Sequence, residues 1–106
     1  MIPHGVEIFV AVDPVDMRFG FERLGGVARE RVGREPRSKA LFVFCGRRRH
    51  TWKLLYWDGT GVVLVTKRLD RGLFEMPIAE RGGASVMLSD AAFEALFAGL
   101  TTHVVH

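Results

Sequence analysis

The sequence predicts a small α+β domain with a mainly antiparallel sheet, in the order strand, helix, three-strand meander, strand and helix, with the helices on one face. Three observations predict this class. Short apolar stretches rich in β-branched and aromatic residues recur along the chain, two segments with helical apolar spacing flank the central stretches, and Asp58-Gly59 marks a tight hairpin turn. Because the chain has 106 residues and no linker rich in Pro, Gly or Ser, residues 1–106 are expected to form one domain.

The first strand and the first helix are predicted within residues 6–32. Residues 6–12 are apolar and rich in β-branched side chains, which favours a strand. The strand is expected to end at Asp13-Pro14, where Asp13 is a suitable helix N-cap and Pro14 suits the first helical position. A helix from there to about residue 32 is predicted by apolar residues at spacings of four, three and four, namely Met17, Phe21, Leu24 and Ala28.

Three strands are predicted at residues 40–44, 51–57 and 62–69, where the apolar pattern changes to a period of two. Since a tight turn joins the last two, an antiparallel meander is the simplest arrangement. A short strand is then predicted at residues 84–88. A C-terminal helix is predicted at about 89–99, with Ser89 as its N-cap and a buried face of Phe93, Leu96, Phe97 and Leu100.

Positive charge is concentrated in the middle of the chain. The formal net charge is +3, but residues 1–36 carry −1, residues 37–72 carry +7 and residues 73–106 carry −3. We call residues 37–72 the basic hairpin region. Twelve of the fifteen basic residues are Arg, and the chain has neither Asn nor Gln, a composition that a GC-rich genome produces without selection on function.

No catalytic or metal site is predicted. Asp13 is interpreted as a cap and Asp58 as a turn residue, so the sequence offers no cluster of carboxylates for metal-dependent nucleotidyl transfer. The single cysteine, Cys45, excludes an internal disulfide framework and a thiolate zinc site. Three of the four histidines, His4, His103 and His106, lie near a terminus. No cofactor is expected, because no phosphate loop or dinucleotide fingerprint is present.

A cytoplasmic protein without a membrane partner is expected. No apolar run approaches the roughly 18 residues that span a bilayer, and no signal-peptide pattern opens the chain. A single cysteine fits a reducing compartment.

The basic hairpin region predicts a nucleic-acid-binding site. Its phosphate-contacting residues are predicted to be Arg47, Arg48 and Arg49 at a hairpin tip and Lys53, Lys67 and Arg68 on the strands, with Trp57 packing against sugar or base. Without Asn and Gln, which make bidentate adenine contacts, recognition of the backbone or of DNA shape is favoured over base readout. The alternative interpretation is a solvated basic hairpin over an aromatic core. Arg18 is either a further phosphate contact or the partner of Asp13 or Asp16.

Three segments resemble one protein family. Asp16-Met17-Arg18-Phe19-Gly20 resembles its DMR-x-G helix start, and residues 41–48, 53–59 and 67–74 are similar to its FVF-x-GRR, KLL-x-WD and KRL-x-x-G-x-F core. Residues 88–100 are similar to its C-terminal helix. The family is that of the TnpB or Orf2-like accessory proteins of insertion-sequence-sixty-six-type bacterial transposable elements. The chain departs from the family pattern at Met76, where Trp is usual before the proline, and at Phe19, where a basic residue is common.

The resemblance implies a protein encoded beside a separate DDE-type transposase and needed for efficient transposition, with no established catalytic activity. We therefore expect a non-catalytic accessory protein that binds DNA through the basic hairpin region and has the transposase of the same element as its partner; a homo-oligomer fits the same expectation. The alternative is a protein-interaction module that docks on the transposase without contacting DNA. A small nuclease would need a carboxylate cluster that includes Asp16 or Asp58.

Overall fold

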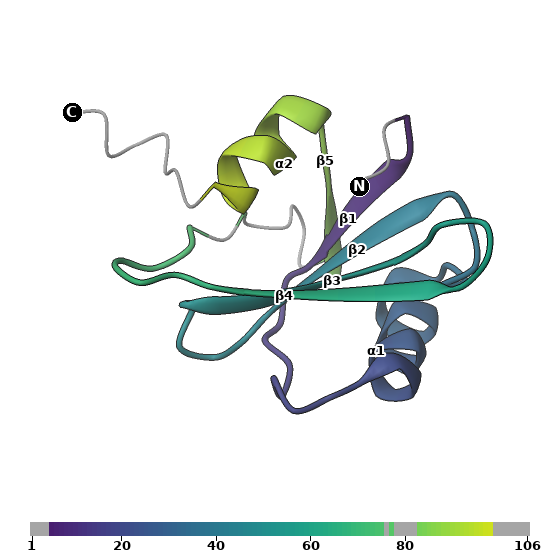
Figure 1. The fold of residues 1–106 in the computed structure, drawn as a ribbon, viewed down its shortest axis with the longest axis horizontal. Helices are drawn as coiled ribbons and strands as arrows, with labels where there is room; N and C mark the ends of the chain where they lie inside the picture. The colour runs from purple at the N-terminus through teal and green to yellow at the C-terminus, as the bar shows by residue number, and fades with distance from the viewer. Residues whose placement is uncertain (1–4, 76, 78–82, 99–106) are drawn as a thin grey trace.

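The computed structural model describes residues 5–75, 77 and 83–98 (Figure 1). In chain order its elements are β1 (Glu7–Ala11), α1 (Phe21–Val27), the π-helical turn η1 (Ala28–Val32), β2 (Ala40–Cys45), β3 (Thr51–Trp57), β4 (Val62–Arg68), β5 (Ser85–Leu88) and α2 (Asp90–Phe97). The predicted α+β class is confirmed, as is the order of strands and helices. Among the described residues, no helix combines the length and the apolarity needed to cross a membrane.

The five strands form one sheet in the order β4-β3-β2-β1-β5. The predicted meander of β2, β3 and β4 is antiparallel, β5 is antiparallel to β1, and only the pair of β1 and β2 is parallel. The turn between β3 and β4 is stabilised by the Asp58 carboxylate, which accepts hydrogen bonds of 2.9 Å from the Thr60 and Gly61 amides and from the Thr60 hydroxyl. These bonds, first that from the Thr60 amide, lower the pKa of Asp58. The interpretation of Asp58 as a turn residue is therefore confirmed.

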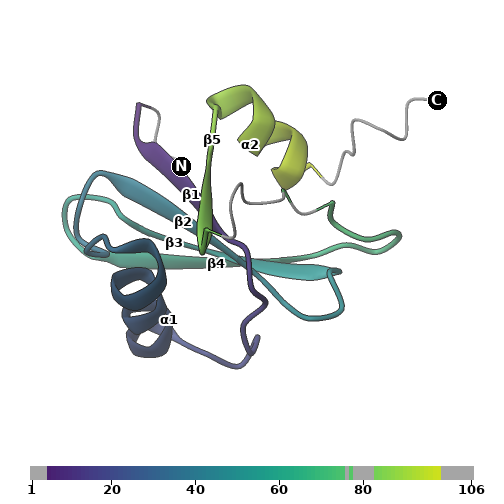
Figure 2. The same cartoon turned by 180° about the vertical axis from the view of Figure 1, so that it is seen from behind.

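The two helices lie on opposite faces of the sheet, so the prediction that both pack on one face is wrong. Figures 1 and 2 show α1 on one side of the sheet and α2 on the other. One core cluster, which includes Val10, Leu41 and Trp52, takes Phe93 and Leu96 from α2. The second cluster lies under α1 and η1 and includes Phe9, Leu24, Ala28, Phe42 and Phe44.

The connections between the strands explain this arrangement. Parallel strands need a crossover, and α1 with η1 lies in the crossover from β1 to β2, which places it on one face. The helix α2 follows β5 and covers the other face. The sequence feature that indicates helices on both faces is the uninterrupted apolar run of β2, in which all six residues are buried. Such runs are typical of strands that are covered on both faces.

The first helix starts later than its sequence pattern predicts. Gly20 is its N-cap, and Asp13 is exposed and caps nothing. The preceding segment is instead held against the end of β2, because the Val15 amide donates to the Cys45 carbonyl at 3.0 Å. The Asp16 carboxylate then accepts from the Arg18 amide at 2.9 Å, a local bond that competes with a helical path.

The second helix begins as predicted. The hydroxyl of Ser89 accepts from the Ala92 amide at 3.1 Å, and Phe93 and Leu96 are buried. The remaining positions of the predicted helix end, Gly99 and Leu100, lie outside the described residues.

Candidate functional site

Four exposed arginines gather at one end of the sheet. Arg47, Arg48 and Arg49 lie in the loop that joins the end of β2 to the start of β3, and Arg68 is the last residue of β4. Because Arg68 pairs with Thr51, the first residue of β3, the end of β4 meets this loop. We call Arg47, Arg48, Arg49 and Arg68 the arginine cluster.

The backbone of the loop is fixed by hydrogen bonds. The Arg49 amide donates to the Gly46 carbonyl at 3.0 Å, and the Arg49 carbonyl accepts from the Phe74 amide at 2.6 Å. The His50 carbonyl accepts from the Leu69 amide at 2.8 Å, which ties the loop to the segment after β4. Arg49 has a φ of 61°, in the left-handed region that favours glycine. The surrounding bonds therefore hold Arg49 in a conformation that its own side chain disfavours.

This conformation makes the stability effect of one substitution predictable. Arg49→Gly is expected to raise the free energy of unfolding slightly, by up to about 1 kcal/mol, because glycine adopts a positive φ without steric cost. Urea denaturation measures the change. Arg48→Gly, at a neighbouring position without a positive φ, is the matched control and is expected to destabilise the protein. Equal losses of stability in both variants would contradict the structural account of Arg49.

The arginine cluster borders an open hollow of about 690 Å³. Three parts of the chain line it, namely Pro14, Val15, Asp16 and Met17; Gly46, Arg47, Arg48, Arg49, His50 and Thr51; and Thr66 and Arg68. Gly46 permits the contact between the first two parts, because a Cβ atom there would lie 2.7 Å from Cγ of Met17. The DMR, GRR and KRL motifs thus meet around one hollow.

Asp16 carries a carboxylate at this hollow and is paired with Arg18. Nη2 of Arg18 lies 2.7 Å from Oδ2 of Asp16, and Nε of Arg18 donates to both carboxylate oxygens at 3.1 and 3.2 Å. These bonds from the Arg18 side chain, followed by that from its amide, lower the pKa of Asp16 to about 2, so Asp16 is ionised at neutral pH. Of the alternatives for Arg18, the structure shows the pair with Asp16; its side chain is still 90% exposed.

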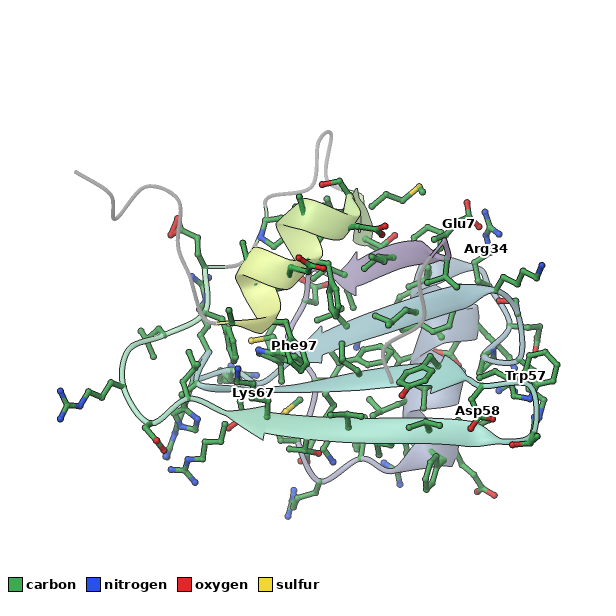
Figure 3. The ribbon with its side chains drawn as sticks, turned by 45° about the horizontal axis from the view of Figure 1, so that its top comes forward. Glu7, Arg34, Trp57, Asp58, Lys67 and Phe97 are labelled. Carbon is green, nitrogen blue, oxygen red and sulfur yellow. The ribbon has the colours of Figure 1, made fainter. Side chains whose placement is uncertain are left out.

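The two predicted lysines have structural partners elsewhere. Nζ of Lys53 donates to the Phe19 carbonyl at 2.9 Å, on the face covered by α1. Nζ of Lys67 donates to the Phe97 carbonyl at 2.6 Å, at the end of α2, and lies 4.8 Å from the centroid of the Phe97 ring (Figure 3). In the register of β3 and β4, Lys53 pairs with Thr66, which directly precedes Lys67. Because successive side chains of a strand point to opposite faces, the side chains of Lys53 and Lys67 lie on opposite faces of the sheet.

Trp57 lies at the far end of β3 from the arginine cluster. It pairs with Val62, the first residue of β4, and is 38% exposed. It lies six residue steps along the strand from Thr51, a span of about 20 Å. Figure 3 shows Trp57 beside the turn at Asp58, at the opposite end of the sheet from Lys67. The structure therefore groups four of the predicted site residues and leaves Lys53, Lys67 and Trp57 outside that group.

The contacts of Lys67 predict a stabilising role. Lys67→Met is expected to lower the free energy of unfolding by about 1–2 kcal/mol, because it removes a charged hydrogen bond to a helix-terminal carbonyl and a cation–π contact. Urea denaturation measures the loss. Lys39→Met, at an exposed lysine, is the control and is expected to change stability by less than about 0.5 kcal/mol. An equally small effect of Lys67→Met would show that its contacts stabilise nothing.

Sequence reasoning missed several residues that line the hollow, among them Thr51, Thr66 and Met17. Thr51, Thr66 and Arg68 lie on the α1 face of the sheet, as the register shows. The alternation of side chains along the predicted strands was the sequence feature that could have indicated this shared face. Met17 was assigned to a helix face, and only the tertiary structure places it against Gly46.

The described residues show neither a metal-binding cluster nor a reactive thiol. They contain no group of three or more His, Cys, Asp or Glu side chains placed to hold a metal ion. Cys45 is buried, and burial raises the pKa of its thiol to about 11, which disfavours the nucleophilic thiolate. The ring of His50 lies 2.8 Å from the Thr51 hydroxyl. His4, His103 and His106 lie outside the described residues.

Comparison with known proteins identifies the family. The family model described as IS66 Orf2 like protein matches residues 6–106, nearly the whole chain. The chain belongs to this family. IS66 Orf2-like proteins are associated with the transposition of insertion sequences, which agrees with the resemblance of the DMR, GRR and KRL motifs.

Two curated relatives of this IS66 Orf2-like protein come from Sinorhizobium fredii. The uncharacterized protein y4hO is 39% identical over 102 residues, which cover 94% of this chain and 87% of y4hO. The uncharacterized protein y4jC is 35% identical over 96 residues, which cover 91% of this chain and 80% of y4jC. No solved structure matches the chain.

Proposed function

We propose that this IS66 Orf2-like protein is a non-catalytic accessory factor of transposition that binds DNA through the arginine cluster and assists a separate DDE transposase. The observation that carries the proposal is that four exposed arginines border one hollow at one end of the sheet. Among the described residues that line the adjoining hollow, Asp16 has the one carboxylate, and Arg18 offsets its charge. The cluster therefore presents positive charge to a ligand.

The chemistry of arginine favours a phosphate backbone as that ligand. A guanidinium group binds phosphate oxygens through two parallel hydrogen bonds and stays charged at every physiological pH. Contacts to phosphates position a protein on DNA without reading its sequence. Since the chain lacks Asn and Gln, recognition rests on the backbone and on the local shape of the DNA.

The salt dependence of DNA binding tests this proposal. If the four arginines each neutralise one phosphate, the logarithm of the association constant falls with the logarithm of salt concentration with a slope of about −3 to −4. The affinity then drops by roughly 100-fold between 50 and 200 mM salt. Fluorescence anisotropy with a labelled duplex measures both values. Absence of binding at about 50 mM salt, where electrostatic attraction is strong, would refute the proposal.

A second candidate function is a module that docks on the transposase without touching DNA. Two exposed aromatic residues favour it, since Phe21 is 53% exposed and Trp57 38% exposed. Phe21 and Val62, the pairing partner of Trp57, line a groove of about 670 Å³ away from the arginine cluster. Exposed aromatic side chains are typical anchors of protein interfaces. Co-purification with the transposase, together with no DNA binding at about 50 mM salt, would favour this function.

A further inference from the structure

We infer that the hollow beside the arginine cluster binds the terminal nucleotide of a DNA strand that carries a phosphate monoester at its end. This inference rests on the proposed function and specifies which part of DNA the site takes. It starts from the shape of the site, because the four arginines border a concave surface of about 690 Å³ and do not lie on a flat one.

The size of the hollow selects a strand end over an intact duplex. Its volume of about 690 Å³ equals that of a cube about 9 Å on edge, and it lies in the range of small-molecule pockets. The major groove of B-DNA is alone about 12 Å wide, so a base-paired duplex is too broad to enter. A single nucleotide that extends beyond the duplex fits such a space.

The lining of the hollow offers separate partners to the parts of a nucleotide. The guanidinium groups of the arginine cluster and the hydroxyls of Thr51 and Thr66 suit phosphate and sugar oxygens. Pro14 and Met17, from the segment that precedes α1, also line the hollow and give an apolar surface for the base or the sugar. A lining that combines apolar surface with a few polar groups is typical of ligand sites rather than of surfaces that only follow a DNA backbone.

The charge of the cluster favours a terminal phosphate in particular. A phosphate monoester carries about −1.5 to −2 at neutral pH, whereas each backbone diester carries −1. Four arginines around one hollow therefore attract a monoester more strongly than a diester. The monoester can belong to a 5′ end or to a 3′ end, and the experiment separates the two.

The test compares DNAs of one sequence that differ only in their ends. The full-length protein is titrated by fluorescence anisotropy with a covalently closed minicircle and with linear duplexes that bear short single-stranded overhangs. The linear duplexes end in a 5′-phosphate, in a 3′-phosphate or in hydroxyl groups alone. A linear duplex with one of the two terminal phosphates is expected to bind at least about fivefold more tightly than the minicircle, because of the extra charge at the end. Its counterpart with only hydroxyl ends is expected to lose most of that preference.

Two variants localise the effect. Arg68→Gln, in the hollow, is expected to lower the preference for phosphorylated ends to less than about twofold. Arg71→Gln removes the same charge from an exposed position that does not line the hollow, and it is expected to weaken binding to all four DNAs alike. A loss of end preference in Arg71→Gln equal to that in Arg68→Gln would overturn the assignment to the hollow.

The outcomes separate this inference from the proposed function. Equal, salt-dependent binding of the minicircle and of every linear duplex would overturn the inference and leave the proposed function in place. A preference for ends that survives the removal of the terminal phosphate would also overturn it. No binding of any DNA at about 50 mM salt would refute the proposed function itself.

Discussion

Reversing the charge of Arg47, Arg48 and Arg49 to Glu is expected to weaken DNA binding by at least about 100-fold at 50 mM salt, the largest functional effect that the structure predicts. Three of the four phosphate contacts that we propose for the arginine cluster disappear, and three carboxylates repel the DNA backbone in their place. The slope of log affinity against log salt is expected to shrink from about −3.6 toward −0.9, since about one contact remains. Anisotropy titrations at several salt concentrations measure both quantities.

A control with the same change of charge is available on the same chain. Arg31, Arg37 and Lys39 are exposed and precede the start of β2, whereas the arginine cluster follows its end. Replacing these three with Glu also changes the net charge by six. We expect at most about a tenfold loss of affinity there, because only long-range attraction is reduced and 50 mM salt screens it beyond about 14 Å. Equal losses in the two triple variants would show that net charge alone controls binding.

Trp52→Ala is expected to have the largest effect on stability, a loss of about 3–5 kcal/mol in the free energy of unfolding. The Trp52 side chain is 1% exposed, and its ring centroid lies 5.3 Å from that of Phe74 and 4.8 Å from that of Phe97. It thus joins β3, α2 and the segment after β4. Since small domains have total stabilities of about 5–15 kcal/mol, this one cavity removes a large share.

Trp52→Ala is also expected to affect the loop of the candidate site. The Phe74 amide donates to the Arg49 carbonyl, so loss of the packing between Trp52 and Phe74 loosens one support of the loop that carries the arginines. Urea denaturation measures the stability loss. Trp57→Ala removes the same side chain from the exposed end of the same strand and is expected to cost less than about 1 kcal/mol. Similar losses for the two tryptophans would contradict the burial that the structure shows.

Local sequence patterns predicted most of the elements. The alternation of residues 51–57 and 62–69 predicted β3 and β4, the Asp58-Gly59 pair predicted their turn, and Ser89 predicted the start of α2. These features depend on residues close together in the chain, where side-chain period and turn geometry are decided. The start of α1 was mispredicted because bonds to a distant strand, such as that from Val15 to Cys45, competed with the local helical pattern.

The sequence predicted that the candidate site is rich in basic residues, but it did not predict which of these residues lie together. The basic hairpin region contains all four members of the arginine cluster, together with Lys53 and Lys67. Nothing in the spacing showed that the two lysines would bind the carbonyls of Phe19 and Phe97, because those partners come from other parts of the chain.

By itself, then, the sequence determined the α+β class, the order of the elements, the family and the concentration of positive charge in residues 37–72. Only the tertiary structure decided that the helices cover opposite faces and that Asp16, Gly46 and Arg68 meet around one hollow. The physical reason is the range of the interactions. Periodicity and turns act over a few residues, whereas the meeting of three motifs depends on strand register and on the crossover between β1 and β2, which bring distant parts of the chain together.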